Sequence, residues 1–124
     1  MIITEQEILE LQKFISQLNS KNGKVIVEGK KDRIALKKLG YTGEILEFHK
    51  FGGIINFTDS MAKYENIIIL FDWDKKGRYL TRKVINLLQR RTNVDTSYKR
   101  KLREITKGKI IFVEQLMCYE SHLV

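Results

Sequence analysis

Five apolar residues run directly into two aspartates, one residue apart, in the stretch Ile-Ile-Ile-Leu-Phe-Asp-Trp-Asp-Lys-Lys-Gly at positions 67–77. A continuous apolar run rich in isoleucine is typical of a strand buried on both faces, as in a parallel sheet. Asp72 and Asp74 then fall at the carboxyl end of that strand, where open α/β sheets place their binding sites. Two carboxylates this close repel each other unless a cation lies between them. The stretch predicts a metal site, with a solvated acidic turn as the alternative.

The rest of the chain alternates between short apolar segments and segments in which apolar residues recur at helical spacing. We expect strands at 24–28, 44–48, 66–71 and 109–113. We expect helices at 5–19, 31–39, 54–64 and 76–91, and from Thr96 or Ser97 to Ile105, with a polar break at 92–96. This alternation predicts an α/β fold in which helices flank a mainly parallel sheet of about four strands.

Thr4 and Glu7 fit a capping box at the start of the first helix, with each side chain accepting from a free backbone amide. The 124 residues are expected to form one domain over 1–124, with a core at 24–113 and the helix at 5–19 before it. No apolar run approaches the roughly 20 residues that span a bilayer, and no signal peptide is visible. Cys118 is the only cysteine, which favours a cytoplasmic protein without an internal disulfide.

Positive charge is concentrated in one third of the chain. The formal net charge is +8, yet the segment from Lys75 to Lys109 holds thirteen lysines and arginines against Asp95 and Glu104, a net of +11. The remaining residues carry a net of −3. This asymmetry favours a polyanionic partner, nucleic acid before an anionic membrane. A basic surface without a specific partner is the alternative.

Glu28 also ends a predicted strand, at 24–28. If that strand neighbours the one at 66–71, Glu28 faces Asp72 and Asp74 across the crevice at the carboxyl edge of the sheet. Three carboxylates then converge beside the starts of two helices, where phosphate groups bind readily. Carboxylate oxygens are suitable ligands for Mg²⁺. The residues therefore predict a site for metal-assisted chemistry on a phosphate ester.

Two motifs resemble those of the Toprim domain, which is shared by type IA and type II topoisomerases, bacterial-type primases and a ribosomal-RNA maturation ribonuclease. They are Val-Ile-Val-Glu-Gly-Lys-Lys-Asp at 25–32 and Phe-Asp-Trp-Asp-Lys-Lys-Gly at 71–77. The glutamate-glycine of the family matches Glu28 and Gly29, and its Asp-x-Asp-x-x-Gly matches Asp72, Asp74 and Gly77. The resemblance covers about residues 24–113 and is closest to small stand-alone Toprim proteins of archaea, so it implies a Rossmann-like Toprim fold.

The resemblance also implies roles for these residues. Asp72 and Asp74 would bind Mg²⁺, with Mn²⁺ as a substitute, and Glu28 would act as general acid or base and share the metal. The three are the expected catalytic and metal-binding residues. Positions expected to contact phosphate or nucleic acid are Gly29, Lys30, Lys31, Lys75, Lys76, Gly77, Arg78, Arg90, Arg91, Lys99, Arg100, Lys101 and Arg103. The basic residues of the 97–105 helix are expected to point outward.

The reaction is less constrained than the site. Toprim enzymes usually rely on further domains, and none of the five tyrosines stands in a context that marks a nucleophile. We expect Mg²⁺-dependent, nuclease-like phosphodiester chemistry on RNA or DNA; a non-catalytic nucleic-acid-binding or scaffolding subunit of a larger complex stays open. A haloacid-dehalogenase-type phosphatase also uses Asp-x-Asp, but on its first strand and before Thr or Val, whereas Lys75 follows here.

Overall fold

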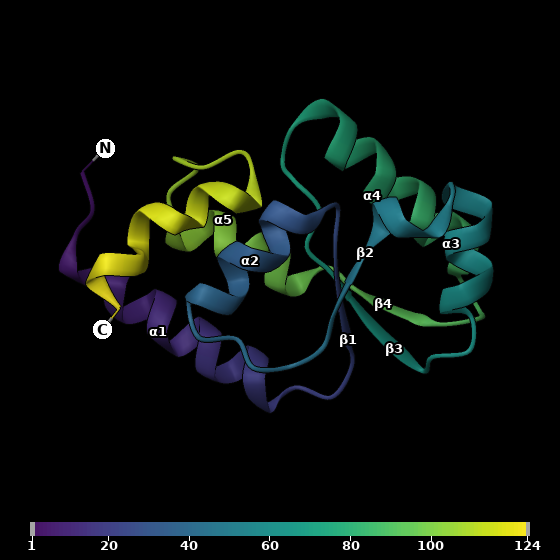
Figure 1. The fold of residues 1–124 in the computed structure, drawn as a ribbon, viewed down its shortest axis with the longest axis horizontal. Helices are drawn as coiled ribbons and strands as arrows, with labels where there is room; N and C mark the ends of the chain where they lie inside the picture. Colours follow the sequence, from purple (N-terminus) through teal and green to yellow (C-terminus); the bar gives the residue numbers. More distant parts are fainter. Residues whose placement is uncertain (1, 124) are drawn as a thin grey trace.

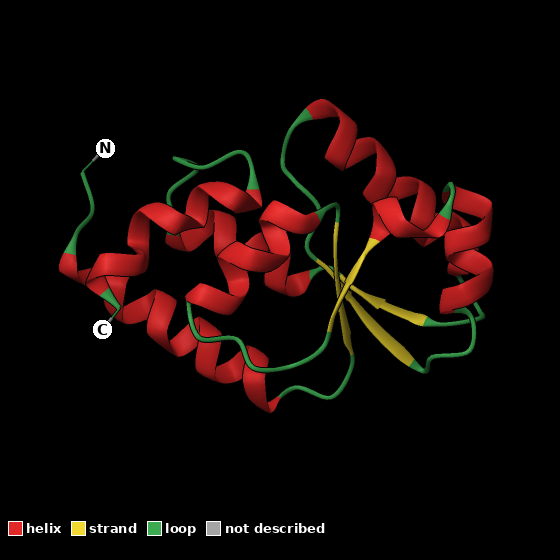
Figure 2. Cartoon of the chain, in the orientation of Figure 1, coloured by secondary structure: helices red, strands yellow, loops and turns green. Residues whose placement is uncertain are grey.

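Four parallel strands form the centre of the molecule (Figures 1 and 2), for which the computed structural model describes residues 2–123. The sheet order is β2 (Ile45–Glu47), β1 (Lys24–Val27), β3 (Asn66–Ile69) and β4 (Asn93–Asp95). Every neighbouring pair is parallel. The predicted α/β class with a parallel sheet of four strands is confirmed.

Alternate residues of the two central strands serve two separate cores. Val25, Val27, Ile68 and Leu70 belong to one core, whereas Ile26, Ile67, Ile69 and Phe71 belong to the other. This alternation follows from the two-residue period of a strand. Because helices cover both faces, all of these side chains are buried, which explains the unbroken apolar run of β3.

The helices divide between the two faces (Figure 1). The first core contains residues of α1 (Glu5–Ser20), α2 (Lys30–Lys38), α5 (Ser97–Ile105) and the 3-10 helix η2 (Val113–His122). The second core contains residues of η1 (Phe48–Phe51), α3 (Ile54–Met61) and α4 (Lys75–Leu88). The predicted helices are all present, with ends shifted by a few residues.

The neighbouring positions of β1 and β3 determine where the acidic residues meet. Ile26 pairs with Ile69 in the parallel register, and the Leu70 amide donates to the Ile26 carbonyl at 2.8 Å. Glu28 lies two residues beyond Ile26, and Asp72 three residues beyond Ile69. Both side chains therefore leave the sheet at the same carboxyl edge, as expected from the sequence.

The predicted strand at 109–113 is wrong, and β4 lies in the predicted polar break instead. The amides of Ile111 and Phe112 donate to the Gln115 side chain, and the Val113 amide donates to Asp72 Oδ1. These backbone groups are satisfied without a strand partner. β4 is short, polar and at the edge of the sheet, so it lacks the apolar pattern that identifies buried strands.

Only half of the predicted capping box forms. The Glu7 amide donates to Thr4 Oγ1 at 3.1 Å, but the Glu7 carboxylate turns into the protein and is 1% exposed. It accepts from Lys109 Nζ at 2.6 and 2.7 Å and from the Tyr119 hydroxyl at 2.9 Å. Burial acts to raise the pKa of Glu7, but the Lys109 and Tyr119 hydrogen bonds and the Lys109 charge outweigh it and lower that pKa. This ion pair, in which Glu7 is buried and Lys109 is partly exposed, links α1 to the segment after α5.

Among residues 2–123, no helix combines the length and the apolar character needed to cross a lipid bilayer.

Candidate metal and nucleic-acid site

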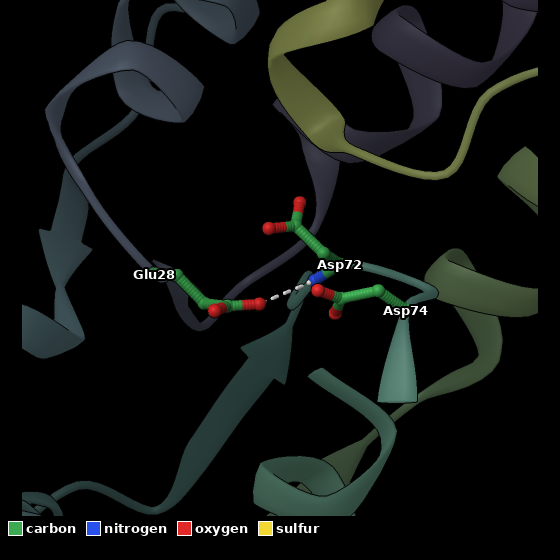
Figure 3. A group of neighbouring side chains, drawn as sticks. All are labelled: Glu28, Asp72 and Asp74. Atoms are coloured by element: carbon green, nitrogen blue, oxygen red, sulfur yellow. Dashed lines mark hydrogen bonds between the residues drawn. The ribbon is translucent and has the colours of Figure 1, made fainter. Parts of the chain in front are cut away.

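Glu28, Asp72 and Asp74 come together at the carboxyl edge of β1 and β3 (Figure 3). One carboxylate oxygen from each of the three lies within 4.8 Å of the other two. Glu28 and Asp74 face each other from the two strand ends. Glu28 is 5% exposed and Asp72 is 9% exposed, so two of the three carboxylates are largely withdrawn from water.

Each carboxylate is held in place by one backbone amide. The Asp72 amide donates to Glu28 Oε2 at 2.8 Å, and the Val113 amide donates to Asp72 Oδ1 at 2.7 Å. Asp74 is the N-cap of α4, where its Oδ1 accepts from the Gly77 amide at 2.8 Å. Among residues 2–123, no amide, hydroxyl or ammonium group donates to the second oxygen of any of these carboxylates. Three fixed side chains therefore each keep one oxygen for another ligand.

This donor set fits a hard divalent cation. Mg²⁺ prefers oxygen ligands, takes one or two carboxylates and keeps several waters. Its bonds to oxygen are about 2.0–2.1 Å long, so two ligands of one ion lie at most about 4.2 Å apart. Oxygens within 4.8 Å of one another meet that requirement after a small side-chain rotation or through one bridging water.

The electrostatics of the cluster also favour a cation. The pKa of Asp72 is raised to about 6 by burial and by the neighbouring Glu28 and Asp74, against the lowering effect of the Val113 amide. Asp32, in the first turn of α2, has its pKa raised to about 6 by burial and by the Asp72 charge. Its two oxygens accept from the Gly29 and Glu114 amides. The site thus concentrates negative charge where water screens it poorly.

Lys99 is buried beneath the site, so the outward position predicted for it is wrong. It is 8% exposed, and its Nζ donates to the carbonyls of Phe71 and Asp72 at 2.9 and 2.7 Å. Burial lowers its pKa to about 8, although the nearby carboxylates act in the opposite direction. Lys99 therefore fixes the backbone that carries the aspartates. The sequence did hold a sign of this burial. Lys99 lies three and seven residues before the buried Leu102 and Thr106, and positions at this spacing share a helix face.

Gly77 is required by packing against the site. A Cβ at this position would lie 2.1 Å from the Asp72 carbonyl oxygen, which is backbone and cannot rotate away. At Gly29, by contrast, an added Cβ would meet only the His49 ring, at 3.2 Å. The two motif glycines thus differ: Gly77 permits α4 to start against the strand end, whereas the Gly29 position has more room.

Several of the predicted phosphate-binding residues surround the cluster. Lys30 and Lys31 begin α2, and Lys75, Lys76 and Arg78 lie in the first turn of α4. Both helices start at the edge that carries the carboxylates, and all five side chains are exposed. Arg78 also lines a pocket with Arg100 and Arg103 of α5 and with Trp73. This edge therefore combines acidic and basic groups.

Three other predicted residues lie elsewhere. Arg90 and Arg91 line a depression with Glu65 and Asn93, at the amino ends of β3 and β4 and thus at the opposite edge of the sheet. Arg91 also forms an ion pair with Asp59 at 3.4 Å. The Lys101 ammonium lies 5.1 Å from the centre of the Tyr98 ring and lines a pocket with residues of α1. The structure does not bring these three to the carboxylates.

Trp73 packs in the first core. It is 7% exposed, and the Lys99 ammonium lies 5.3 Å from its ring centre. Its amide donates to the Ile111 carbonyl at 2.7 Å. The loop at 109–112 is therefore fastened to the site at Trp73, and Val113, which follows it, is fastened at Asp72. Sequence reasoning missed this contribution because the loop was expected to be a strand.

The carboxylate cluster lies in a segment that matches a known domain. A model of the Toprim domain matches residues 24–114, which include every residue of the carboxylate cluster. A UPF0292 protein of Thermococcus sibiricus is 36% identical over 107 residues, covering 86% of this chain and 84% of that protein. A UPF0292 protein of Methanosarcina barkeri is 33% identical over 120 residues, covering 95% of this chain and 83% of that protein.

A solved structure of a protein from Aquifex aeolicus has a similar fold. The TM-score is 0.62 at 25% sequence identity, and the match covers 93% of this chain and 99% of that protein. The match takes in nearly all of both chains, so the similarity is not confined to the sheet.

Proposed function

Because this chain belongs to the Toprim domain family, a family of metal-binding proteins that process nucleic acids, we propose that it cleaves nucleic-acid phosphodiester bonds in a Mg²⁺-dependent reaction. The observation that supports this most strongly is the carboxylate cluster. Three acidic side chains, each fixed by a backbone amide, leave one oxygen apiece within 4.8 Å of the others. Of the activities known in the family, hydrolysis needs the fewest additional protein groups.

Asp72 and Asp74 hold the cation in this proposal, and Glu28 shares it. These residues would hold a divalent cation, which would supply stabilisation of the negative charge on the phosphoryl oxygens. Glu28 has one oxygen fixed by the Asp72 amide and one that accepts no hydrogen bond from the described part of the chain. That second oxygen takes a proton from the attacking water, or returns one to the oxygen that leaves phosphorus.

The surrounding groups bind the substrate. Lys75 and Lys76 follow Asp74 at the start of α4, and Lys30 follows Gly29 at the start of α2. Helix N-termini and ammonium groups both attract phosphate. The two helix starts flank the cluster, so they hold the phosphates on either side of the bond to be broken.

The test is incubation of the purified protein with a panel of structured and single-stranded RNAs and DNAs, with Mg²⁺ or with a chelator. We expect cleavage of at least one class of substrate in Mg²⁺ alone. Glu28→Gln and Asp72→Asn should reduce the rate at least 100-fold, since general acid–base and metal-binding groups contribute effects of this order. Asp59→Asn is the matched control, because Asp59 is exposed and lies on α3.

Cleavage that persists in both site variants would come from a contaminant or from another site and would contradict the proposal. Salt-sensitive binding without cleavage in any metal would support the second function, a non-catalytic subunit that binds nucleic acid.

A further inference from the structure

A pocket of about 300 Å³ lies between α4 and α5, beside the carboxylate cluster. Its lining includes Trp73, Arg78, Ile85, Lys99, Arg100 and Arg103. Trp73 stands between the two aspartates, and Arg78 is one helical turn beyond Asp74, with its amide donating to the Asp74 carbonyl at 3.0 Å. The pocket therefore adjoins the place where the proposed function puts the scissile phosphate.

The pocket is positively charged and has no internal counter-charge. Arg78, Arg100 and Arg103 are exposed, and none of their guanidinium groups forms an ion pair or side-chain hydrogen bond with any of residues 2–123. No carboxylate lines the pocket. Two other arginines of the chain are paired with carboxylates, Arg33 with Glu47 and Arg91 with Asp59. Three unpaired guanidinium groups gathered in one pocket suit an anion supplied from outside.

The same pocket offers apolar surface as well as charge. Trp73 and Ile85 contribute to its lining together with the aliphatic parts of the arginines. Guanidinium planes bind phosphate, and they also stack on unpaired bases. Ligand pockets are commonly on the order of 300–1,000 Å³, so this one suits a single nucleotide and is too small for a base pair with its backbone.

We propose that this pocket binds one unpaired nucleotide of the nucleic-acid strand, next to the phosphodiester at the carboxylate cluster. Arg78, Arg100 and Arg103 bind its phosphate or stack on its base, and the apolar lining receives the base or sugar. The proposal rests on the proposed function for the identity of the substrate, and it adds a preference for single-stranded over duplex nucleic acid near the cleaved bond.

Trp73 is the only tryptophan in the chain, so its fluorescence reports directly on the pocket. The experiment titrates the protein with an unstructured oligonucleotide, in chelator, and follows both Trp73 emission and the anisotropy of a label on the oligonucleotide. We expect a saturable change in Trp73 emission with wild-type protein. The double variant Arg100→Gln/Arg103→Gln should bind roughly 10- to 30-fold more weakly near 0.1 M salt, because two phosphate contacts are lost.

Arg90→Gln/Arg91→Gln removes the same charge at the opposite edge of the sheet and should weaken binding much less. Thermal unfolding checks that all variants fold. Equal weakening by the two double variants, equal binding of a duplex of the same sequence, or an equal emission change with inorganic phosphate would each overturn the nucleotide pocket.

The outcomes separate this proposal from the proposed function. Arginine-dependent binding without cleavage in Mg²⁺ supports the pocket and contradicts the nuclease. Cleavage and binding that are unchanged in Arg100→Gln/Arg103→Gln support the nuclease and contradict the pocket.

Discussion

Glu7 and Asp72 are both buried carboxylates at places where distant parts of the chain meet, yet their surroundings are opposite. Glu7 accepts from Lys109 and from Tyr119, and its pKa is lowered. Asp72 has two other carboxylates beside it, and its pKa is raised to about 6. Both side chains are at most 9% exposed. Burial acts to raise the pKa of both groups, and the directions differ because Lys109 and Tyr119 outweigh it at Glu7, whereas the charges of Glu28 and Asp74 add to it at Asp72.

The comparison separates a structural ion pair from a binding site. At Glu7 the chain supplies its own cation, and the pair links α1 to the C-terminal segment. At Asp72 the buried ammonium of Lys99 donates to backbone carbonyls and not to the carboxylate oxygens. The three carboxylates consequently keep a negative charge that the protein does not neutralise by direct contact. A cluster of this kind is stabilised by an external cation, whereas the Glu7 pair gains nothing from one.

The largest expected loss of stability comes from breaking the ion pair between Glu7 and Lys109. Lys109→Met leaves the Glu7 carboxylate buried without its cation, and breaking a buried pair in this way costs about 3 kcal/mol. Urea unfolding at neutral pH measures the loss. Lys13→Met, at an exposed position of α1, is the control and should change stability by less than about 0.5 kcal/mol. A loss below about 1 kcal/mol in Lys109→Met would show that the pair is not a structural requirement.

Gly77→Ala should cause the next largest loss of stability, and it acts at the carboxylate cluster. The new methyl group would lie 2.1 Å from the Asp72 carbonyl oxygen, so α4 and the strand end must move apart. Such overpacking costs about 2 kcal/mol and displaces Asp74, which should also remove the stabilisation by Mg²⁺. Gly29→Ala, where an added Cβ meets only the His49 ring, should cost less than about 1 kcal/mol. Equal stability of the two variants would contradict the packing requirement at Gly77.

Replacing a carboxylate by its amide should change stability in opposite directions at Asp72 and at Glu7. Without divalent cations at pH 8, Asp72→Asn relieves repulsion from Glu28 and Asp74 and should raise the free energy of unfolding by about 1 kcal/mol. The Val113 hydrogen bond survives, because an asparagine oxygen also accepts. Glu7→Gln should lower stability, because the Lys109 charge then lacks its partner. Chemical denaturation of both variants is the measurement, and a loss of stability in Asp72→Asn would break the comparison.

The smallest effect is the dependence on pH. Asp72 and Asp32 have folded-state pKa values of about 6 against an ordinary 3.8, so the fold favours their protonated forms. Their contribution to stability is complete below about pH 4 and is lost as the pH rises through 6. Glu7, whose pKa is lowered, contributes in the opposite sense: its stabilisation is present above its ordinary pKa of 4.5 and lost at lower pH.

Between pH 8 and pH 5.5 Asp72 and Asp32 take up protons, whereas Lys99, whose pKa is about 8, is protonated near the upper limit and opposes the gain slightly. The cation-free protein should therefore unfold at a slightly higher temperature at pH 5.5. Mg²⁺ should raise the unfolding temperature at pH 8 and much less at pH 5.5, because protons compete for the same oxygens. Melting curves at both pH values, with and without Mg²⁺, test this. A larger effect of Mg²⁺ at the lower pH would contradict it.

The sequence predicted the sheet and the carboxylates because both depend on local patterns. β3 is an unbroken apolar run, and Glu28, Asp72 and Asp74 follow strand ends that parallel topology brings to one edge. The error at 109–113 has a tertiary cause, since its amides bond to the side chains of Asp72 and Gln115. No local pattern distinguishes such a loop from a strand. β4 was missed because its residues are polar and lack the apolar pattern of a buried strand.

Lys99 and Glu7 show the same limit for charged residues. Both were assigned by their types, Lys99 to a nucleic-acid surface and Glu7 to a capping box. Both are instead buried by long-range contacts, Lys99 with the end of β3 and Glu7 with Lys109 and Tyr119. A charged side chain is seldom buried without a partner for its charge or hydrogen bonds. The partners of Lys99 and Glu7 lie 27 to 112 residues away in the chain.

Calorimetric titration of the protein with Mg²⁺ and with Mn²⁺ at pH 8 tests the central claim, that the cluster of Glu28, Asp72 and Asp74 binds a divalent cation. We expect saturable binding by the wild-type protein, loss of that binding in Asp72→Asn and in Asp74→Asn, and unchanged binding in Asp59→Asn. Binding of equal strength in wild type and Asp72→Asn, or no binding by a folded wild-type protein, would contradict the claim.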